Sequence, residues 1–474
     1  MSASHAEQVE PTGSSAWETL RLFLEERRGS KAPSADFEEF EGRLHDLVAA
    51  MECEAVGEEL ARFDVDVPVV MIEGVPHRRV VRCSETYFTT AGPVRVPRSL
   101  YAKRTEEGET AQSPMELRAG VVDGRWTPRA AKQAIWFVAE MTPRTVEELY
   151  ERLGGLTPSK SALDRLPKKV SADWEAARSS FEADVRAQEV VPDDVTAVGI
   201  SLDGVMVPVK DGERRAKREQ AEADGKRTRG PAGHEEVGCG TLTFYGRDGE
   251  LRSTIRQARM PEANKATLKA ILTAELMAVL AQRPELTVVR LADGAKDNWT
   301  FLDALPVEGP LVVDFWHAAE HLADALDAAY GEHSPKSRAQ FEKLRHVLRH
   351  DVQGVEKTIR ALVHLRDQHP RSKILKKELK YFRSRRHRMR YADLVAAGLP
   401  IGTGVNEAAC KTLATQRLKC SGMSWGDEGG QAILTLGSLI QSDRFDAAWQ
   451  LLASGYKRDV TIPDNVIPLR PLRG

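Results

Sequence analysis

Three acidic residues in short motifs carry the strongest chemical signal in this chain. Asp203 follows the apolar run Ile200–Leu202, Asp293 ends a similar run, and Glu407 opens a helical pattern. Carboxylates are the hard oxygen ligands that Mg²⁺ and Mn²⁺ prefer. Two such ions can stabilise the attacking and leaving oxygens of a phosphodiester. We therefore expect Asp203, Asp293 and Glu407 to be catalytic residues that hold two divalent ions.

Each motif also has a purely structural interpretation. Asp203 and Asp293 both precede glycine, and an Asp-Gly pair favours a tight turn. We accordingly expect a hairpin at Asp203–Gly204, with strands over 196–203 and 205–210. An acid at position 407 is favoured by the dipole of the helix that it begins.

The order of the expected elements favours the chemical interpretation. Three antiparallel strands are followed by a helix over 261–282, a strand over 287–292, a short helix, a strand over 310–313 and then helices. This is the element order of the RNase H-like fold, a mixed-sheet α/β core. In that fold the first and fourth strands are neighbours, so Asp203 and Asp293 are expected to share the metal pair.

A second cluster follows the strand over 310–313. Asp314 ends this strand, His317 begins a helix, and His321 lies four residues further on. Histidines at this spacing can bind zinc, contact DNA or form a buried hydrogen-bonded pair. No third zinc ligand is obvious in the sequence, and we interpret Asp314 and His317 as residues that support the metal site.

The charge distribution indicates a nucleic-acid partner. The 474 residues carry a formal net charge of only −2, but residues 1–64 hold 15 acidic against 6 basic residues and residues 334–394 hold 18 basic against 6 acidic. Basic blocks attract phosphate backbones. We expect Arg385 and Arg386 of this block to contact DNA.

Basic residues also follow Glu407. Lys411 lies one helical turn after the glutamate, and Arg417 and Lys419 come next. A surface ion pair between Glu407 and Lys411 is the simpler interpretation. We favour contacts from Lys411, Arg417 and Lys419 to the phosphates that flank the cleaved bond.

Helix-start signals recur before the first core strand. Thr-Pro pairs at 127–128, 142–143 and 157–158 predict three helix N-termini. The last two helices, over 145–153 and 159–166, are joined by a glycine-containing turn typical of a helix-turn-helix. Lys160 and Arg165 of the second helix are candidate DNA contacts, although a plain helical hairpin fits equally well.

Composition and patterning place the chain in a reducing compartment. Five scattered cysteines form no CxxC pair, and no apolar stretch has the length of a signal peptide or membrane span. We expect a soluble cytoplasmic protein. The expected parts are a mobile segment over 1–34, a helix and β-hairpin unit over 35–110, a helical DNA-binding region over 111–189, the core over 190–332 and 400–452, a basic helical insertion over 333–399, and a tail over 453–474.

Four motifs together resemble the signatures of bacterial DDE transposases of the ISKra type. These motifs are Leu202-Asp203-Gly204, Ala292-Asp293-Gly294-Ala295, the segment 314–322 that begins Asp314-Phe315-Trp316-His317, and the segment 404–425 that begins Gly404-Val405-Asn406-Glu407. The resemblance covers about residues 80–445, and the D-x-x-H feature at Asp314 is similar to that of Mutator-like elements.

The resemblance implies that Asp203, Asp293 and Glu407 are the metal-binding triad, with an all-helical insertion between the second and third acids. It implies metal-dependent cleavage of insertion-sequence DNA ends and strand transfer into target DNA. The expected partners are double-stranded DNA, both terminal inverted repeats and target, and further copies of the chain in a homodimer or larger assembly at the nucleoid. No membrane is expected.

Two other functions fit the same residues. One is a transposase-derived DNA-binding protein that lacks catalysis. The other is an RNase H-like nuclease that acts on branched or hybrid nucleic acid, although the large helical insertion fits this function less well.

Overall fold

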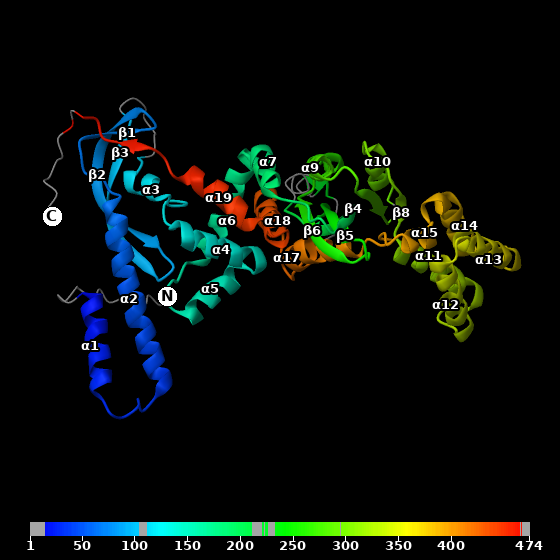
Figure 1. Ribbon diagram of the computed structural model, residues 1–474, viewed down its shortest axis with the longest axis horizontal. Helices are drawn as coiled ribbons and strands as arrows, with labels where there is room; N and C mark the ends of the chain where they lie inside the picture. Colours follow the sequence, from blue (N-terminus) through cyan, green and yellow to red (C-terminus); the bar gives the residue numbers. More distant parts are fainter. Residues whose placement is uncertain are drawn as a thin grey trace. The chain divides into compact units, whose positions relative to one another are not determined.

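The chain folds into two compact units of mixed α/β structure. The structure is a computed structural model, and it describes residues 15–103, 111–210, 220–221, 223–225, 233–293, 295–464 and 466. One unit comprises Met1–Trp174 and Ala447–Gly474, and the other comprises Glu175–Asp446 (Figure 1). The residues with candidate metal chemistry all lie in the second unit.

A five-stranded mixed sheet forms the centre of the second unit. Its spatial order is β6-β5-β4-β7-β8, with β4 antiparallel to β5, β5 antiparallel to β6, and β4, β7 and β8 mutually parallel. β4 and β7, the first and fourth strands of this sheet in chain order, are therefore neighbours, as expected. The strands are β4 (Val195–Pro208), β5 (His234–Gly246), β6 (Leu251–Arg259), β7 (Thr287–Ala292) and β8 (Leu311–Val313).

The hairpin expected at Asp203–Gly204 is wrong. β4 runs without interruption through both residues, and its antiparallel register with β5 pairs Asp203 with Cys239 and continues to Pro208 opposite His234. The ladder with β5 provides hydrogen-bond partners for the backbone N–H and C=O groups here. This pairing outweighs the local preference of an Asp-Gly pair for a turn. Most of the charged segment 211–233 lies outside the described residues.

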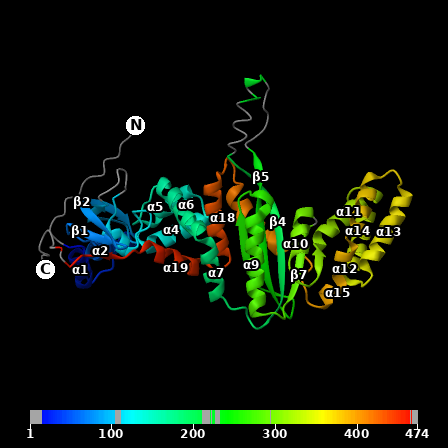
Figure 2. The same cartoon turned by 90° about the horizontal axis from the view of Figure 1, so that it is seen from above.

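Helices pack on both faces of this sheet. α9 (Ala266–Gln282) covers one face, where Leu272 lies against Gly240 of β5 so closely that a Cβ there would meet it at 2.4 Å (Figure 2). Gly240 pairs with Leu202, so Leu202 faces α9 and the next residue, Asp203, faces the other side. That other side receives α16 (Gly404–Ala409) and a π-helix (Cys410–Thr415), which continues into α17 (Gln416–Leu418), while α18 (Asp427–Gln441) packs on β6.

A helical block separates β8 from α16 along the chain; it begins at residue 315 and includes the stretch 333–399 over which a basic helical insertion was predicted. Its inner face contributes to the same hydrophobic core as the sheet. The block contains α11 (Phe315–Tyr330), α12 (Pro335–His350), α13 (Gly354–Gln368), α14 (Lys373–Arg385), the 3₁₀-helix η2 (Arg386–Arg388) and α15 (Tyr391–Ala396). The remaining elements of the unit are α7 (Arg178–Gln188), η1 (Ala263–Lys265) and α10 (Lys296–Ala304).

The other unit combines a four-stranded sheet with helices. The strand order is β3-β2-β1-β9, and the predicted hairpin corresponds to β2 and β3. The elements are α1 (Ala16–Gly29), α2 (Phe37–Arg62), β1 (Val69–Ile72), β2 (Val75–Phe88), β3 (Pro93–Ala102), α3 (Pro114–Ala119), α4 (Pro128–Glu140), α5 (Pro143–Leu153), α6 (Lys160–Ala176), α19 (Phe445–Tyr456) and β9 (Val460–Thr461).

Two terminal segments depart from expectation. Residues 16–29, within the segment expected to be mobile, form α1, whose Leu20 and Phe23 are buried. In the expected tail, Val460 and Thr461 pair with β1. α1 is an amphipathic run of good helix formers capped by Ser15, and its Phe23 stacks on Phe40 of α2, whereas the two residues of β9 are ordered by their pairing with β1.

The Thr-Pro signals predicted two of the three helix starts. Thr127 and Thr142 are N-caps with proline at the first helical position of α4 and α5. α6 begins later, at Lys160, where the Ser159 hydroxyl accepts a hydrogen bond from Ala162 N at 3.3 Å. A serine oxygen is an equally good cap, so the nearby proline does not decide the start.

Candidate functional site

Asp203 and Asp293 lie side by side at neighbouring positions of parallel strands. β4 and β7 are in register with Ser201 opposite Leu291, and each aspartate comes two residues later. Both are half-buried. Burial raises the pKa of the Asp203 carboxyl, and the negative charge of Asp293 raises it further, against the opposing effect of a backbone hydrogen bond from Gly204. Two adjacent carboxylates repel each other, and a cation bound between them would relieve this repulsion.

Local hydrogen bonds hold both aspartates in place. Asp293 Oδ1 accepts from Ala295 N at 3.0 Å, which forms the turn into α10. From α10, Asn298 Nδ2 donates to Leu202 O at 3.1 Å, directly before Asp203. α10 is therefore tied to both carboxylate-bearing strands, and their relative position depends on it.

Asp314 organises a second group of polar residues. It is fully buried and is the N-cap of α11, where its Oδ1 accepts from His317 N at 2.7 Å. Its Oδ2 accepts from the Thr403 hydroxyl at 2.9 Å and from Thr403 N. Burial alone would raise the pKa of Asp314, but the hydrogen bonds from His317 and Thr403 lower it below its usual value. Both oxygens are occupied, so Asp314 positions its neighbours.

Glu407 and His317 meet at this group. The Thr403 hydroxyl lies 3.1 Å from Glu407 Oε1, and His317 Nδ1 lies 3.2 Å from Asp314 Oδ1 and 4.0 Å from Glu407 Oε1. The hydrogen bond to Asp314 raises the pKa of His317 to about 9, helped by the nearby charges of Asp314, Glu320 and Asp293. His317 is therefore a cation at neutral pH that lies within electrostatic reach of Asp293.

The ligand geometry differs in part from the predicted triad. Among the described residues, one group of three ligand side chains has its atoms within 4.8 Å of one another, and it comprises Asp314, His317 and Glu407. Asp203 and Asp293 pair with each other, and Glu407 pairs with Thr403 and His317. Two ions about 3.5–4 Å apart do not require all three acids to touch, so the triad stays a prediction that the geometry permits.

A pair of thiols connects the two halves of the site. Cys239 is opposite Asp203 on β5, and Cys410 follows Glu407 by three residues at the start of the π-helix. Both are buried, and their thiols hydrogen-bond to each other. This contact fixes the helix of Glu407 against the strand next to Asp203. The sequence suggested no such role, since the cysteines are 171 positions apart.

The predicted DNA-binding residues have different environments. Lys160, Lys411, Lys419 and Arg386 are exposed, and Arg165 is exposed in an ion pair with Asp123. Arg385 is half-buried, with its guanidinium 4.5 Å from the ring centre of Tyr381.

Arg417 is a correction, because it is 7% exposed and does not present its guanidinium to a duplex. The physical reason is the π-helix at Cys410–Thr415. Its wider turns shift the phase of the residues that follow, so that Arg417 does not lie on the face that an α-helix would give it.

Sequence reasoning missed three side chains near the carboxylates. Thr403 links Asp314 to Glu407, as described above. Glu378 and Tyr381 come from α14 and contact His321, one helical turn beyond His317. The only sequence signal was the i, i+4 spacing of the two histidines, because α14 itself looks like an ordinary amphipathic basic helix.

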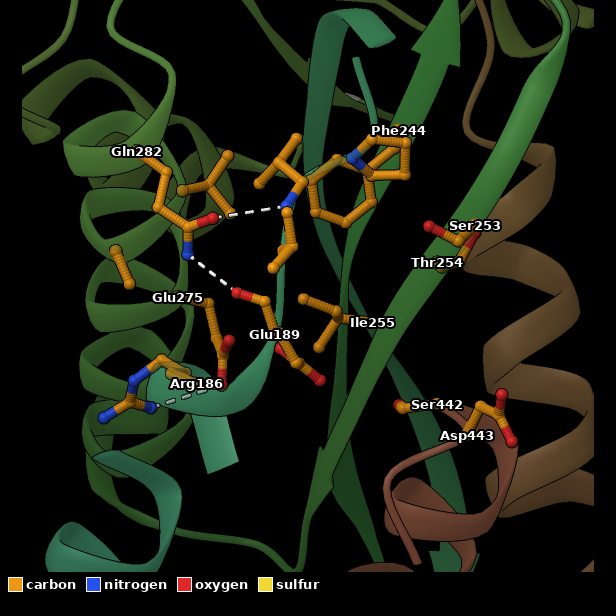
Figure 3. Close-up of a pocket in the computed structure, with 15 residues that line it drawn as sticks. Arg186, Glu189, Phe244, Ser253, Thr254, Ile255, Glu275, Gln282, Ser442 and Asp443 are labelled. Carbon is orange, nitrogen blue, oxygen red and sulfur yellow. Dashed lines mark hydrogen bonds and ion pairs between the residues drawn. The ribbon is translucent and has the colours of Figure 1, made fainter. Parts of the chain in front are cut away.

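A separate cavity of about 320 Å³ lies near the start of β4 (Figure 3). Phe244 on its wall pairs with Val198, five residues before Asp203 on the strand. Gln282 spans its rim, donating to Glu189 O at 3.1 Å and accepting from Val191 N at 3.2 Å. The cavity contains none of the predicted catalytic residues, and its charged wall is occupied by internal ion pairs.

Neither a protein-family model nor a curated protein matches this chain. Within the part of the chain that the structure describes, no helix is both long and apolar enough to cross a membrane.

Proposed function

We propose that this chain is a DDE transposase of the ISKra type, a DNA recombination enzyme encoded by a mobile insertion sequence. Its core would be RNase H-like, and it would cleave the ends of the element and transfer the strands into target DNA. The sheet order β6-β5-β4-β7-β8 supports the fold, and the helical block between β8 and α16 supports the predicted insertion.

One observation carries the proposal: two half-buried carboxylates, Asp203 and Asp293, stand together on adjacent parallel strands. Burial raises the pKa of the Asp203 carboxyl and the negative charge of Asp293 raises it further, so a bound cation would favour the ionised form of both groups. Glu407 adds a third carboxylate from α16, which packs against β4 and β5, and its side chain is 49% exposed. A half-exposed acid beside two fixed acids suits a site that must admit both metal and DNA.

The residues present fit two Mg²⁺ or Mn²⁺ ions. Asp203, Asp293 and Glu407 would hold the ions, which when bound supply charge stabilisation to the attacking and leaving oxygens. Asp314 keeps His317 protonated and turned toward this site. The His317 cation would face the non-bridging oxygens of the cleaved phosphate.

The exposed basic residues would orient the bound DNA. Lys411 and Lys419 follow Glu407, and Arg386 lies at the end of α14; each would contact the backbone without reading sequence. We further propose that at least two copies of the chain act together, because two element ends must be joined. We place this activity in the cytoplasm at the nucleoid.

The test uses labelled DNA from the flanks of the chain's own gene, where the terminal repeats of an insertion sequence would lie. We expect nicking at one boundary with Mg²⁺ or Mn²⁺, and none with EDTA, with Asp203→Asn or with Glu407→Gln. Glu308→Gln, an exposed acid in the loop before β8, is the matched control and should cut normally.

A binding measurement separates the alternatives. Mn²⁺ should raise the melting temperature of the wild type more than that of Asp203→Asn, and both proteins should bind the DNA ends. End binding without cleavage by the wild type would identify a non-catalytic binder. Cleavage of branched or hybrid substrates in preference to repeat ends would identify a nuclease, and cleavage that survives Asp203→Asn would refute the assigned site.

A further inference from the structure

The basic residues of the helical insertion are unevenly distributed. Residues 335–368, which span α12 and α13, hold 8 basic and 4 acidic residues, whereas residues 371–390 hold 10 basic residues and one acid. That acid, Glu378, is fully buried and interacts with His321 and Lys377. The excess positive charge of the insertion is therefore concentrated on α14 and η2, and no acid of this stretch reaches the surface.

Four of these cations form one exposed face of α14. They recur every three or four residues, so they lie on the same side of the helix. All four are exposed, and none has a hydrogen-bond or ion-pair partner for its side chain among the residues that the structure describes. The opposite side of the helix packs into the hydrophobic core. The cationic face of α14 consists of Lys373, Lys376, Lys380 and Arg383.

The stability of the free helix does not explain this face. Lys373 and Lys376 lie in the first turn, which contains no acid, although the helix dipole favours acids over cations there. Like charges three or four residues apart also repel each other, and each cation of the face has at least one such neighbour. The arrangement is therefore unfavourable until a polyanion covers it.

The face has the dimensions of a phosphate backbone. From Lys373 to Arg383 it measures about 15 Å, at about 1.5 Å per residue. One strand of a DNA duplex carries a phosphate about every 3.4 Å along the axis, so the face is as long as about four successive phosphates. A membrane fits less well, because helices that bind membranes insert apolar side chains, and the apolar side of α14 is already buried.

We propose that the cationic face of α14 binds the phosphate backbone of a DNA duplex and supplies a sequence-independent part of the affinity. This inference rests on the proposed function, because it takes DNA as the partner of the chain. Contacts from lysine and arginine to phosphates position a duplex without reading its sequence. The insertion would accordingly hold repeat ends and unrelated DNA equally well.

The test compares the wild type with a quadruple variant that combines Lys373→Gln, Lys376→Gln, Lys380→Gln and Arg383→Gln. One labelled duplex carries the terminal repeat and another has an unrelated sequence, and both are titrated in EDTA over a range of salt concentrations. The slope of log affinity against log salt should fall by about 3–4 in magnitude. Affinity in 0.1 M salt should fall about a hundredfold or more, by the same factor for both duplexes.

The matched control makes the same change at cations of the insertion that already have acidic partners. Arg345 pairs with Glu342, and Lys357 pairs with Asp351. A variant with Arg345→Gln and Lys357→Gln should change the salt slope by less than about one. An equal loss of slope in the control and the quadruple variant would overturn the inference, because any cation of the insertion would then serve. An unchanged slope in the quadruple variant would overturn it as well.

Thermal melting separates binding from a structural role. Glutamine forms helices about as well as lysine and removes the repulsion, so the quadruple variant should be at least as stable as the wild type in low salt. Any gain should disappear in high salt, which screens the repulsion. A lower melting temperature than that of the wild type would show that these cations have partners in the free chain, and would refute the inference.

Failure of this inference is distinguishable from failure of the proposed function. Metal-dependent cutting by the wild type, with a quadruple variant that binds both duplexes equally well, would refute only the role of this face. Binding that the quadruple variant loses, without cutting by the wild type, would support the face and refute the transposase. A variant that loses binding to phosphatidylserine–phosphatidylcholine vesicles but keeps its affinity for DNA would identify a membrane as the partner and overturn the inference.

Discussion

Replacing Asp314 by asparagine should destabilise the second unit strongly. Asp314 is fully buried, and its two oxygens accept from His317 N, Thr403 N and the Thr403 hydroxyl, with His317 Nδ1 3.2 Å away. Asparagine keeps one acceptor oxygen and turns an NH₂ group toward donors. At least two charge-assisted hydrogen bonds are then lost, each contributing about 1.5–3 kcal/mol. Because the partners stay buried, we expect a loss of about 3–5 kcal/mol.

The assay is urea unfolding, supported by thermal melting. For a unit of this size, about 3–5 kcal/mol corresponds to a fall in melting temperature of about 6–20 °C. Asp324→Asn is the matched control, because it makes the same chemical change at an exposed position of the same helix and should stay within about 0.5 kcal/mol of the wild type. If both variants unfold alike, Asp314 is not the organising residue that its hydrogen bonds indicate.

Three further predictions concern stability. The ordinary pKa of His317 is 6.5, and its hydrogen bond to Asp314 in the folded chain raises the pKa to about 9. The contribution of this cation to the free energy of unfolding is therefore complete below pH 6.5 and disappears as the pH rises through 9. The stability difference between wild type and His317→Gln in urea should be larger at pH 6 than at pH 9.5. Tyr391→Phe should cost about 1 kcal/mol in urea unfolding, because its hydroxyl donates to Val313 O at 3.0 Å, and a variant as stable as the wild type would contradict this. Arg444→Met should cost about 3–5 kcal/mol in urea unfolding, because it removes a partner from the buried carboxylate of Glu275. Both oxygens of Glu275 accept hydrogen bonds from Arg444 at 2.8 Å. If adding Glu275→Leu to Arg444→Met restores no stability, the loss does not come from the broken charge pair.

The sheet of the second unit was predictable because its strands have clear hydrophobic limits. β7 was predicted over 287–292, and the structure has the same bounds, since a β-branched run lies between a charged segment and Asp293. The adjacency of Asp203 and Asp293 followed from element order. The Asp203–Gly204 turn was wrong because local preference gave way to a long ladder with β5, which a single sequence does not reveal.

The surroundings of the carboxylates were much less predictable. Glu378 and Tyr381 lie more than 60 positions after Asp314 in a helix whose pattern indicates only an amphipathic face. Arg417 sits in a basic run that predicts exposure, and its burial depends on a π-helix for which the sequence offers no local signal. Long-range contacts and changes of helix phase are therefore the features that the local sequence pattern does not reveal.

The three acids differ in how freely they can move. Asp203 is held within a strand paired on both sides, and Asp293 is fixed by the turn into α10. Glu407 is half-exposed and is held by the Thr403 hydroxyl and by the distant His317 cation, although its helix is anchored through Cys410 to Cys239. Metal entry should therefore move the Glu407 side chain while its backbone and both aspartates stay in place. In the proposed function, a rotamer change of Glu407 that exchanges Thr403 and His317 for the metal ions would be enough to let the two separate halves of the site act as one triad.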